Sequence, residues 1–260
     1  MATTVIKLGG AIVGTSADLD MLWRQIAVLR AQGPVVLVHG GGPQATALAK
    51  RLGHSPRIVH GRRVTTDLDL NIVAWTIRGK LNPMLVASAV SAGLSAVGIS
   101  GVDGGLLRVE KRPPWLVDGE TVDFGWVGDI TGVDTTIVDQ LLAADYMPIV
   151  ATLSADRRGQ LYNVNADTTA YAIAAALGAD ALLLVTETGG VRRDVEDASS
   201  LLAACTRETY EEGLEMGWIS DGMGVKLRVG LDALRAGIGS VFIVGPADLV
   251  HRHYATRIMP

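Results

Sequence analysis

The sequence has few of the residues on which several classes of protein depend. A single cysteine, Cys205, excludes an intrachain disulfide and a zinc site built from several cysteines. No run of 18 apolar residues is free of both charge and glycine, so we expect no membrane-spanning helix. The net charge of -4 gives no general attraction to nucleic acid or to anionic lipid. Anionic ligands must therefore be bound by local clusters of cations.

The opening segment, MATTVIKLGG, has the pattern of a buried strand that ends in two glycines. It lacks the positively charged start and the longer apolar stretch of a secretory signal peptide. We therefore expect a cytoplasmic protein with small-molecule substrates and with neither nucleic-acid nor membrane partners.

Glycine, by contrast, is abundant, and its 31 residues gather where predicted strands end. Short apolar runs alternate with longer helical patterns, which is typical of βαβ units. Strands that are apolar on both faces are expected between two layers of helices. The expected strands are 5–8, 35–38, 96–99, 147–152, 181–186 and 241–244. The expected helices are 18–31, one that ends near 50, 68–92, 133–144, 168–177, 206–216 and 223–236.

The stretch from 101 to 133 departs from this alternation. It carries glycine and proline pairs between short alternating pieces at 106–110 and 121–127, which favours a projecting β-hairpin region. No linker rich in proline, glycine or serine divides the chain. We therefore expect one continuous sheet with two functional lobes, residues 1–155 and 156–260. Cys205 lies in a segment that we interpret as helical, and we expect it to have a packing role.

Two glycine-rich turns follow the first two predicted strands. The first, Lys7 to Gly10, places an ammonium group beside backbone that a ligand can approach closely. The second, His39 to Pro43, leads three glycines into a helix, whose free N–H groups and dipole favour an anion. The second turn matches neither a P-loop nor a dinucleotide-binding motif. A plain turn hardly needs three glycines in a row, so we interpret it as a binding site.

Two later segments supply further cations. Arginine can hold a carboxylate through two parallel charge-assisted hydrogen bonds, and the pair Arg62-Arg63 offers this, although Arg62 can equally be solvated. The segment 221–226, DGMGVK, is a turn that leads into a helix with Lys226 in its early turns. His54 is expected to be a solvated loop residue or to lie at a helix end.

The segment 163–167, NVNAD, combines two amides with one carboxylate. If it is extended, Asn163, Asn165 and Asp167 lie on one side, which suits substrate recognition and the ordering of a cation. It can at the same time be the capped start of a helix.

These segments occur in the order KLGG, HGGG, GRRVT, NVNAD and DGMGVK. In this order, and at these spacings, the chain resembles the amino acid kinase family over essentially its whole length, and within it the acetylglutamate kinases. The resemblance implies a three-layer αβα sandwich with an open, mostly parallel sheet of about eight strands. The first lobe would bind an acyl amino acid and the second ATP. The implied activity is ATP-dependent phosphorylation of the side-chain carboxylate of N-acetyl-L-glutamate.

The resemblance also implies a role for each matching residue. Lys7 and Lys226 would neutralise charge on the substrate side and the nucleotide side, and Asp167 would orient both lysines. The substrate-binding residues would be Gly41, Gly42, Arg63, Asn163 and Asn165. The phosphate- and nucleotide-binding residues would be Gly9, Gly10, Thr186, Glu187, Gly189, Asp221, Gly222 and Met223.

Such a reaction needs positioning and charge neutralisation, and no general base, because the attacking carboxylate is already ionised. Mg²⁺ would arrive on ATP, held by phosphates and water, so no metal-binding residues are expected. The chain lacks the N-terminal helical extension of the arginine-sensitive hexamers that it resembles, which favours a homodimer without arginine feedback.

Some positions depart from the family pattern, and two other functions stay open. Glu187 stands where an aspartate is more usual, and Pro83 where a lysine is usual. One alternative is a related kinase of carrier-protein-linked α-aminoadipate or glutamate. The other is a non-catalytic, ligand-sensing member, which the presence of both lysines and of Asp167 disfavours.

Overall fold

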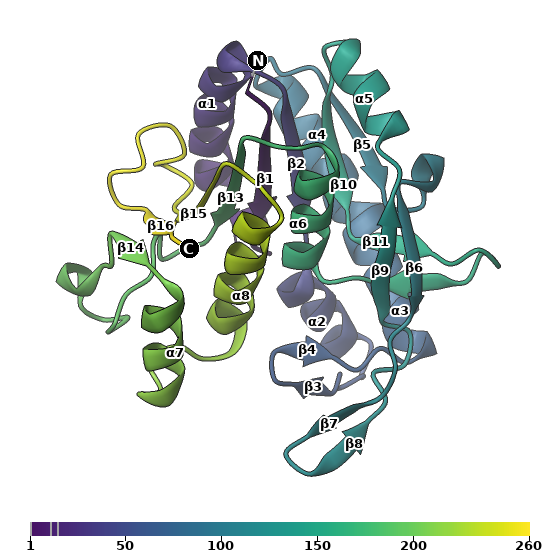
Figure 1. Ribbon diagram of the computed structural model, residues 1–260. Helices are drawn as coiled ribbons and strands as arrows, with labels where there is room; N and C mark the ends of the chain where they lie inside the picture. Colours follow the sequence, from purple (N-terminus) through teal and green to yellow (C-terminus); the bar gives the residue numbers. More distant parts are fainter. Residues whose placement is uncertain (1, 11, 15) are drawn as a thin grey trace.

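The computed structural model describes residues 2–10, 12–14 and 16–260, and its centre is an eight-stranded sheet (Figure 1). The strand order is β14-β16-β15-β13-β1-β2-β10-β5, and every pair is parallel except β15 with β16. The strands are β1 (Thr4–Leu8), β2 (Val35–His39), β5 (Ala96–Ser100), β10 (Met147–Ala151), β13 (Ala181–Val185), β14 (Ala204–Cys205), β15 (Ser240–Val244) and β16 (Thr256–Ile258). The mostly parallel α/β sheet predicted from the sequence is confirmed.

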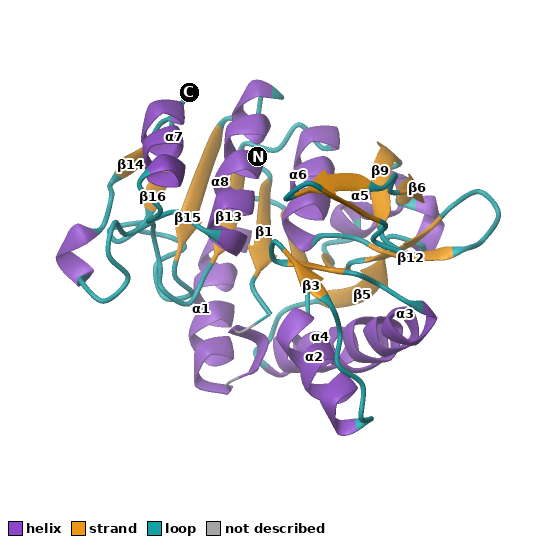
Figure 2. Cartoon of the chain, turned by 90° about the horizontal axis from the view of Figure 1, so that it is seen from below, coloured by secondary structure: helices purple, strands orange, loops and turns teal. Residues whose placement is uncertain are grey.

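Helices cover both faces of this sheet, because alternate strand residues point into two separate cores. Val5 packs with the core on one side and Ile6 with the core on the other. The second core is closed by α1 (Ser16–Gln32) and α4 (Asn82–Ser91). The first is closed by α6 (Ala166–Ala176) and α8 (Asp221–Arg235), so the chain forms three layers. Figure 2 shows the sheet between these helices.

The remaining helices are α2 (Gly42–Arg51), α3 (Asp67–Val73), a π-helix (Ala74–Leu81), α5 (Thr136–Ala143) and α7 (Arg207–Glu215). Short 3₁₀ turns occupy Ile12–Gly14, Asp103–Gly105 and Ala198–Ser200. No helix in the part of the chain that the structure describes is long and apolar enough to span a bilayer.

A small sheet and two hairpins lie at one end of the large sheet. The small sheet has the order β12-β11-β6-β9, with β6 (Leu107–Lys111), β9 (Gly128–Val133), β11 (Leu153–Ala155) and β12 (Leu161–Asn163). The hairpins are β3 (Ile58–Val59) with β4 (Arg62–Arg63), and β7 (Trp115–Val117) with β8 (Glu120–Val122). In Figure 1 both hairpins project at the bottom, so the predicted projecting hairpin is present.

Three sequence-based assignments are wrong. The strand expected at 121–127 ends with β8 at Val122, and the partner of β6 is instead β9. Val133, which was expected to begin a helix, is instead the last residue of β9, and α5 begins only at Thr136. Cys205 lies in the two-residue strand β14 and not in a helix. It is fully buried, and this burial raises the pKa of its thiol to about 11, which agrees with the expected packing role.

The helical stretch predicted at 68–92 is confirmed as one continuous run, but its middle is wound as a π-helix. The wider turn carries Ile77 and Leu81 onto the glycine turn that follows β2. A Cβ atom at Gly41 would lie 2.5 Å from Leu81 Cδ1 and 3.0 Å from Ile77 Cγ1. Only glycine fits this contact without a shift of the neighbours. Wide turns of this kind are frequent at functional sites.

A pair of glycine substitutions tests the packing of the loop before β9. Gly125 has φ 66, and a Cβ there would lie 2.2 Å from the carbonyl oxygen of Thr65, whereas Gly119 has φ 84 and open space around it. We expect Gly119→Ala to lower the free energy of unfolding by about 1 kcal/mol, the cost of the left-handed backbone alone. Gly125→Ala should cost on the order of 3 kcal/mol, because backbone must also move. Urea denaturation measures both, and equal losses would contradict the close contact.

Candidate active site

A cavity of about 390 Å³ opens at the carboxyl ends of β1 and β2, where α2, α6 and α8 begin. In the sheet, β1 has β2 as its neighbour on one side and β13, from the second half of the chain, on the other. Ligands of open α/β sheets bind at such a switch point. The lining includes the glycine turn 40–42, Arg62, Arg63, Asn163, Asn165 and Gly222.

Three charged side chains meet in this cavity: Lys7, Asp167 and Lys226. Lys7 Nζ lies 2.9 Å from Asp167 Oδ1, and Lys226 Nζ lies 3.7 Å from Asp167 Oδ2. The angle of the first contact is unfavourable for a hydrogen bond, so it is an ion pair. They come from β1, the first turn of α6 and the second turn of α8, so the fold joins residues far apart in the sequence. The side chains of Lys7 and Asp167 are 6% and 7% exposed, which leaves water little room to screen the charges.

The electrostatics of the trio follow from burial and from charge. Burial would raise the pKa of Asp167, but the two lysines outweigh it and hold that pKa below its usual value. Burial lowers the pKa of Lys226, which Asp167 partly counters and Lys7 reinforces. One carboxylate therefore faces two ammonium groups, and the trio carries surplus positive charge toward the cavity.

The second glycine turn contributes two residues with free N–H groups to the lining of the same cavity. Gly41 is the N-cap of α2 and Gly42 its first residue. Within the described part of the chain, neither N–H has a hydrogen-bond acceptor. Amides at a helix start are well suited to an anion. Gly10 also lines the cavity, and its carbonyl accepts a bond from Gln44 Nε2. The Gly9 N–H, in contrast, already donates to Val185 O at 3.2 Å.

His39, directly before this turn, is fully buried, and its side chain makes two contacts. Nδ1 lies 2.9 Å from Gly40 O, and Nε2 lies 3.1 Å from Asn82 Nδ2. Burial, which the Gly40 contact only partly offsets, lowers the pKa of His39 from 6.5 to about 4. The imidazole is therefore neutral at physiological pH.

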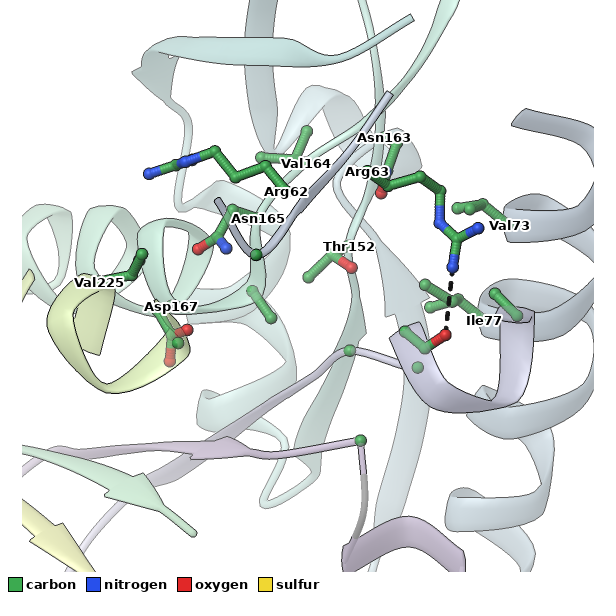
Figure 3. Close-up of a pocket in the computed structure, with 18 of the residues that line it drawn as sticks. Arg62, Arg63, Val73, Ile77, Thr152, Asn163, Val164, Asn165, Asp167 and Val225 are labelled. Atoms are coloured by element: carbon green, nitrogen blue, oxygen red, sulfur yellow. Dashed lines mark hydrogen bonds between the residues drawn. The ribbon is translucent and has the colours of Figure 1, made fainter. Parts of the chain in front are cut away.

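Arg63 and Arg62 point to opposite sides of the cavity (Figure 3). Arg63 is 7% exposed and donates to Thr46 Oγ1 at 2.6 Å and to Asp69 Oδ1 at 3.4 Å. Asp69 is held in turn by Thr66 and by His54, whose Nε2 lies 3.1 Å away. His54 lies just after the end of α2, where its N–H donates to Ala49 O, so the expected helix-end position is confirmed. Its side chain has a further role that was not predicted, because it supports the carboxylate that orients Arg63.

Arg62 lies beside Trp115, with its Cζ 5.0 Å from the ring centre. Arg112 stacks on the same ring at 4.3 Å and pairs with Asp129 at 2.6 Å. Burial and the charges of Arg112 and Arg228 lower the pKa of Arg62. Arg112 lines the cavity but belongs to no motif, so sequence reasoning missed it.

The predicted extended arrangement of the segment 163–167 is only partly correct. Asn163 ends β12, and its Nδ2 donates to Thr65 Oγ1 at 3.2 Å. Asn165 caps α6 by accepting the N–H of Thr168 at 2.9 Å, so Asp167 already lies in the helix. Asn163, Asn165 and Asp167 nevertheless line the cavity together.

The predicted nucleotide-binding residues are more dispersed. Gly222 lines the cavity, and its carbonyl accepts a bond from Lys226 Nζ at 3.2 Å. Thr186, Glu187 and Gly189 form a turn after β13, outside the cavity lining. Met223, on α8, packs against the first core. Asp221 opens α8, and its side chain lies outside the described part.

Among the residues described by the structure, no three His, Cys, Asp or Glu side chains gather in a way that could hold a metal ion. A magnesium ion would have to rely largely on oxygens from elsewhere, and nucleotide phosphates supply such oxygens. Delivery of Mg²⁺ by ATP stays a prediction.

Comparison with known proteins identifies the family. Residues 2–245 match the family described as "Amino acid kinase family". The chain belongs to the amino acid kinase family. The family predicted from the five motifs is thereby confirmed.

Individual relatives agree with this assignment. An acetylglutamate kinase of Anaeromyxobacter dehalogenans (strain 2CP-C) is 44% identical over 257 residues, which cover 96% of this chain and 95% of that protein. One of Methanopyrus kandleri is 43% identical over 246 residues, which cover 95% of this chain and 96% of that protein. Among solved structures, smu.665 of Streptococcus mutans UA159 has a TM-score of 0.82 at 27% identity, covering 99% and 98% of the two chains. A carbamate kinase of Giardia lamblia bound to AMP-PNP has a TM-score of 0.70 at 16% identity, covering 99% and 98%, and it supports the fold alone.

The buried His39 predicts how stability depends on pH. Its folded-state pKa is about 4 against 6.5 in the unfolded chain, so between these values the unfolded state binds more protons. The free energy of unfolding must then fall as the pH falls through this window. His39 alone should account for a loss of about 2 kcal/mol between pH 7 and pH 5.

Urea denaturation of the wild type and of His39→Asn at both pH values measures this loss. Carboxylates with lowered pKa values, such as Asp69 and Asp167, act at still lower pH and do not mask it. The variant should lose about 2 kcal/mol less than the wild type. An identical pH dependence in the two proteins would contradict a buried, neutral His39.

Proposed function

We propose that the chain transfers the γ-phosphoryl group of ATP to the side-chain carboxylate of N-acetyl-L-glutamate and so forms an acyl phosphate. The observation that carries this proposal is the pair of ammonium groups held on both sides of Asp167, beside the free amides of Gly41 and Gly42. The names of the relatives, acetylglutamate kinases at 43–44% identity over nearly the whole chain, supply the substrate.

The chemistry fits this arrangement. A carboxylate oxygen attacks the γ-phosphorus while the bond from that phosphorus to the bridging oxygen of ADP breaks, so no proton has to be removed. The main obstacle is the approach of two anions. The surplus positive charge of the trio, which is buried enough for water to screen it little, lowers this obstacle. Lys7 acts from the substrate side and Lys226 from the nucleotide side, while Asp167 keeps both in place. Mg²⁺, carried on the nucleotide, would add charge neutralisation at the phosphates.

Substrate recognition is assigned to the polar groups on the other side of the cavity. Arg63 would hold the α-carboxylate, with its guanidinium already oriented by Asp69 and Thr46. Asn163 and Asn165 would bind the remaining polar groups of the substrate. Gly9, Gly10, Gly222 and the turn 186–189 would serve the phosphates and the nucleotide.

The two lobes keep their proposed roles, with residues 1–155 for the acyl amino acid and 156–260 for ATP. Lys7 and the glycine turns come from the first lobe and Lys226 from the second, which supports this division. Asn163, although beyond residue 155, pairs with the small sheet of the first lobe through β12. A cytoplasmic location stays a prediction.

Neither alternative function is favoured. The relatives are named acetylglutamate kinases, and neither name mentions a carrier-linked substrate. A non-catalytic role would leave the buried trio of Lys7, Asp167 and Lys226 without a purpose.

A hydroxamate assay with MgATP tests the proposal, with N-acetylglutamate compared against other amino acids and acylated amino acids. Lys7→Ala and Lys226→Ala should each lower kcat on the order of 10²–10³-fold, because each removes one preorganised donor to the transition state. Lys50→Ala, at an exposed site of α2, is the control and should change kcat less than twofold. Turnover that survives loss of either cavity lysine would refute the assigned chemistry.

For the proposed homodimer, we place the subunit contact on α3, the π-helix and α4, which carry large exposed apolar side chains. Leu68 is 42% exposed, Trp75 56% and Met84 38% on this continuous helical run. Contact with a second copy of the chain would remove these apolar side chains from water.

Light scattering of the purified protein should give twice the chain mass of 27.3 kDa. Trp75→Glu should shift the mass to that of one chain, whereas Met216→Glu, at a 74% exposed site on the other lobe, should not. A wild-type protein with the mass of one chain would disprove the dimer.

A further inference from the structure

The glycine turn after β2 contains a peptide that its own two residues cannot orient. The Gly40–Gly41 peptide has glycine on both sides, so no Cβ opposes its rotation by half a turn. A trans peptide is planar, and its C=O and N–H point in opposite directions. Rotation would replace the Gly41 N–H in the cavity with the Gly40 carbonyl oxygen, so an anion would meet an acceptor in place of a donor.

His39 holds this peptide in the orientation that favours an anion. A carbonyl oxygen can only accept, so Nδ1, 2.9 Å from Gly40 O, must carry the proton and donate it. The Gly40 carbonyl is thereby held toward the buried ring, and the Gly41 N–H points the other way. Gly41 lines the cavity, and its N–H has no hydrogen-bond acceptor among the described residues.

Asn82 determines which nitrogen of His39 carries the proton. Its Oδ1 accepts from Arg78 at 2.7 Å, and its Nδ2 donates to Ile149 O at 2.8 Å, so the side-chain amide has only one possible orientation. Nδ2 is therefore also the atom that faces His39 Nε2 at 3.1 Å. Nε2 must accept this bond, which leaves the proton on Nδ1. Both His39 and Asn82 are 0% exposed, so water cannot replace either contact.

The π-helix supports the same turn from a second direction. It ends at Leu81, directly before Asn82, and its side chains Ile77 and Leu81 pack against the Cα atom of Gly41. One helical segment therefore fixes both the position of the turn and, through Asn82 and His39, the direction of its peptide.

We propose that His39, with its proton placed on Nδ1 by Asn82, is a positioning residue that aims the Gly41 N–H at the transferring phosphoryl group. This inference rests on the proposed kinase function, because it assigns the amide a use in that reaction. His39 is not among the residues that line the cavity, and it acts through the Gly40–Gly41 peptide, which lines it.

Two matched substitutions separate positioning from packing. In His39→Asn, the side-chain Nδ2 can occupy the place of Nδ1 and donate to Gly40 O, while the contact with Asn82 is lost. In His39→Gln, the longer side chain can reach Asn82 but does not reproduce the bond to Gly40 O. Positioning predicts that His39→Gln lowers kcat at least 30-fold, with KM for both substrates changed less than threefold. His39→Asn should restore kcat to within about fivefold of the wild type.

If His39 only packed the core, the kcat values of the two variants would rank differently. His39→Asn removes more buried volume, so it would then be at least as impaired as His39→Gln, and that result would overturn the proposal. Thermal unfolding of each variant identifies a loss of kcat that comes from incomplete folding.

A second measurement does not depend on the variants or on turnover. Long-range ¹H–¹⁵N correlation NMR of the ¹⁵N-histidine-labelled wild type at pH 7 should show His39 with a protonated Nδ1 and an unprotonated Nε2. Asn82→Ala should give a mixture of the two tautomers. A protonated Nε2 in the wild type would overturn the inference even if the chain is an active kinase. If the wild type fails to phosphorylate acetylglutamate while Nδ1 carries the proton, the proposed function is at fault, and His39 still orients the turn.

Discussion

The site depends on one balance of charge, that between the Asp167 carboxylate and the two ammonium groups of Lys7 and Lys226. Two buried ammonium groups would repel each other strongly in a medium that screens charge poorly. A carboxylate 2.9 Å from one and 3.7 Å from the other makes their common burial possible. The same carboxylate cancels only one of the two charges, so the cavity keeps an unbalanced positive charge for an incoming anion.

The fold provides this balance by bringing three distant segments to one end of the sheet. Lys7 lies near the end of a strand whose five residues are all buried, so its Cα position is rigidly held. Asp167 is fixed by the Asn165 cap of α6, and Lys226 by the packing of α8 on the same face. The glycine turn, supported by the π-helix and by His39, adds neutral donors beside the cations. Charged and neutral donors thus share one cavity but are held by separate parts of the core.

Sequence patterns predicted the parts of this structure that depend on local chemistry. Buried apolar runs identified the central strands, and glycines after them identified the cavity-forming turns. The short strands β14 and β16 were missed because two or three residues carry too little periodicity. The strand β9 was missed because Gly128, Asp129 and Gly132 obscure its alternation, and the π-helix has the same apolar pattern as an ordinary helix.

Long-range pairs were the least predictable part of the site. Asn82 and His39 are 43 residues apart, and no local pattern links them. The contact of His54 with Asp69 and the place of Arg112 in the cavity wall depend in the same way on how the hairpins fold back. By comparison, Lys7, Asp167 and Lys226 were identified through motifs, and their meeting in space is a property of the fold.

A crystal structure with MgADP, aluminium fluoride and N-acetylglutamate tests the charge balance most directly, because such a complex mimics a phosphoryl group between donor and acceptor. We expect the aluminium fluoride to lie between Lys7 and Lys226, with each Nζ within hydrogen-bond reach and Asp167 still in contact with both. Aluminium fluoride bound away from either lysine, or an Asp167 side chain released from one of them, would contradict this charge balance.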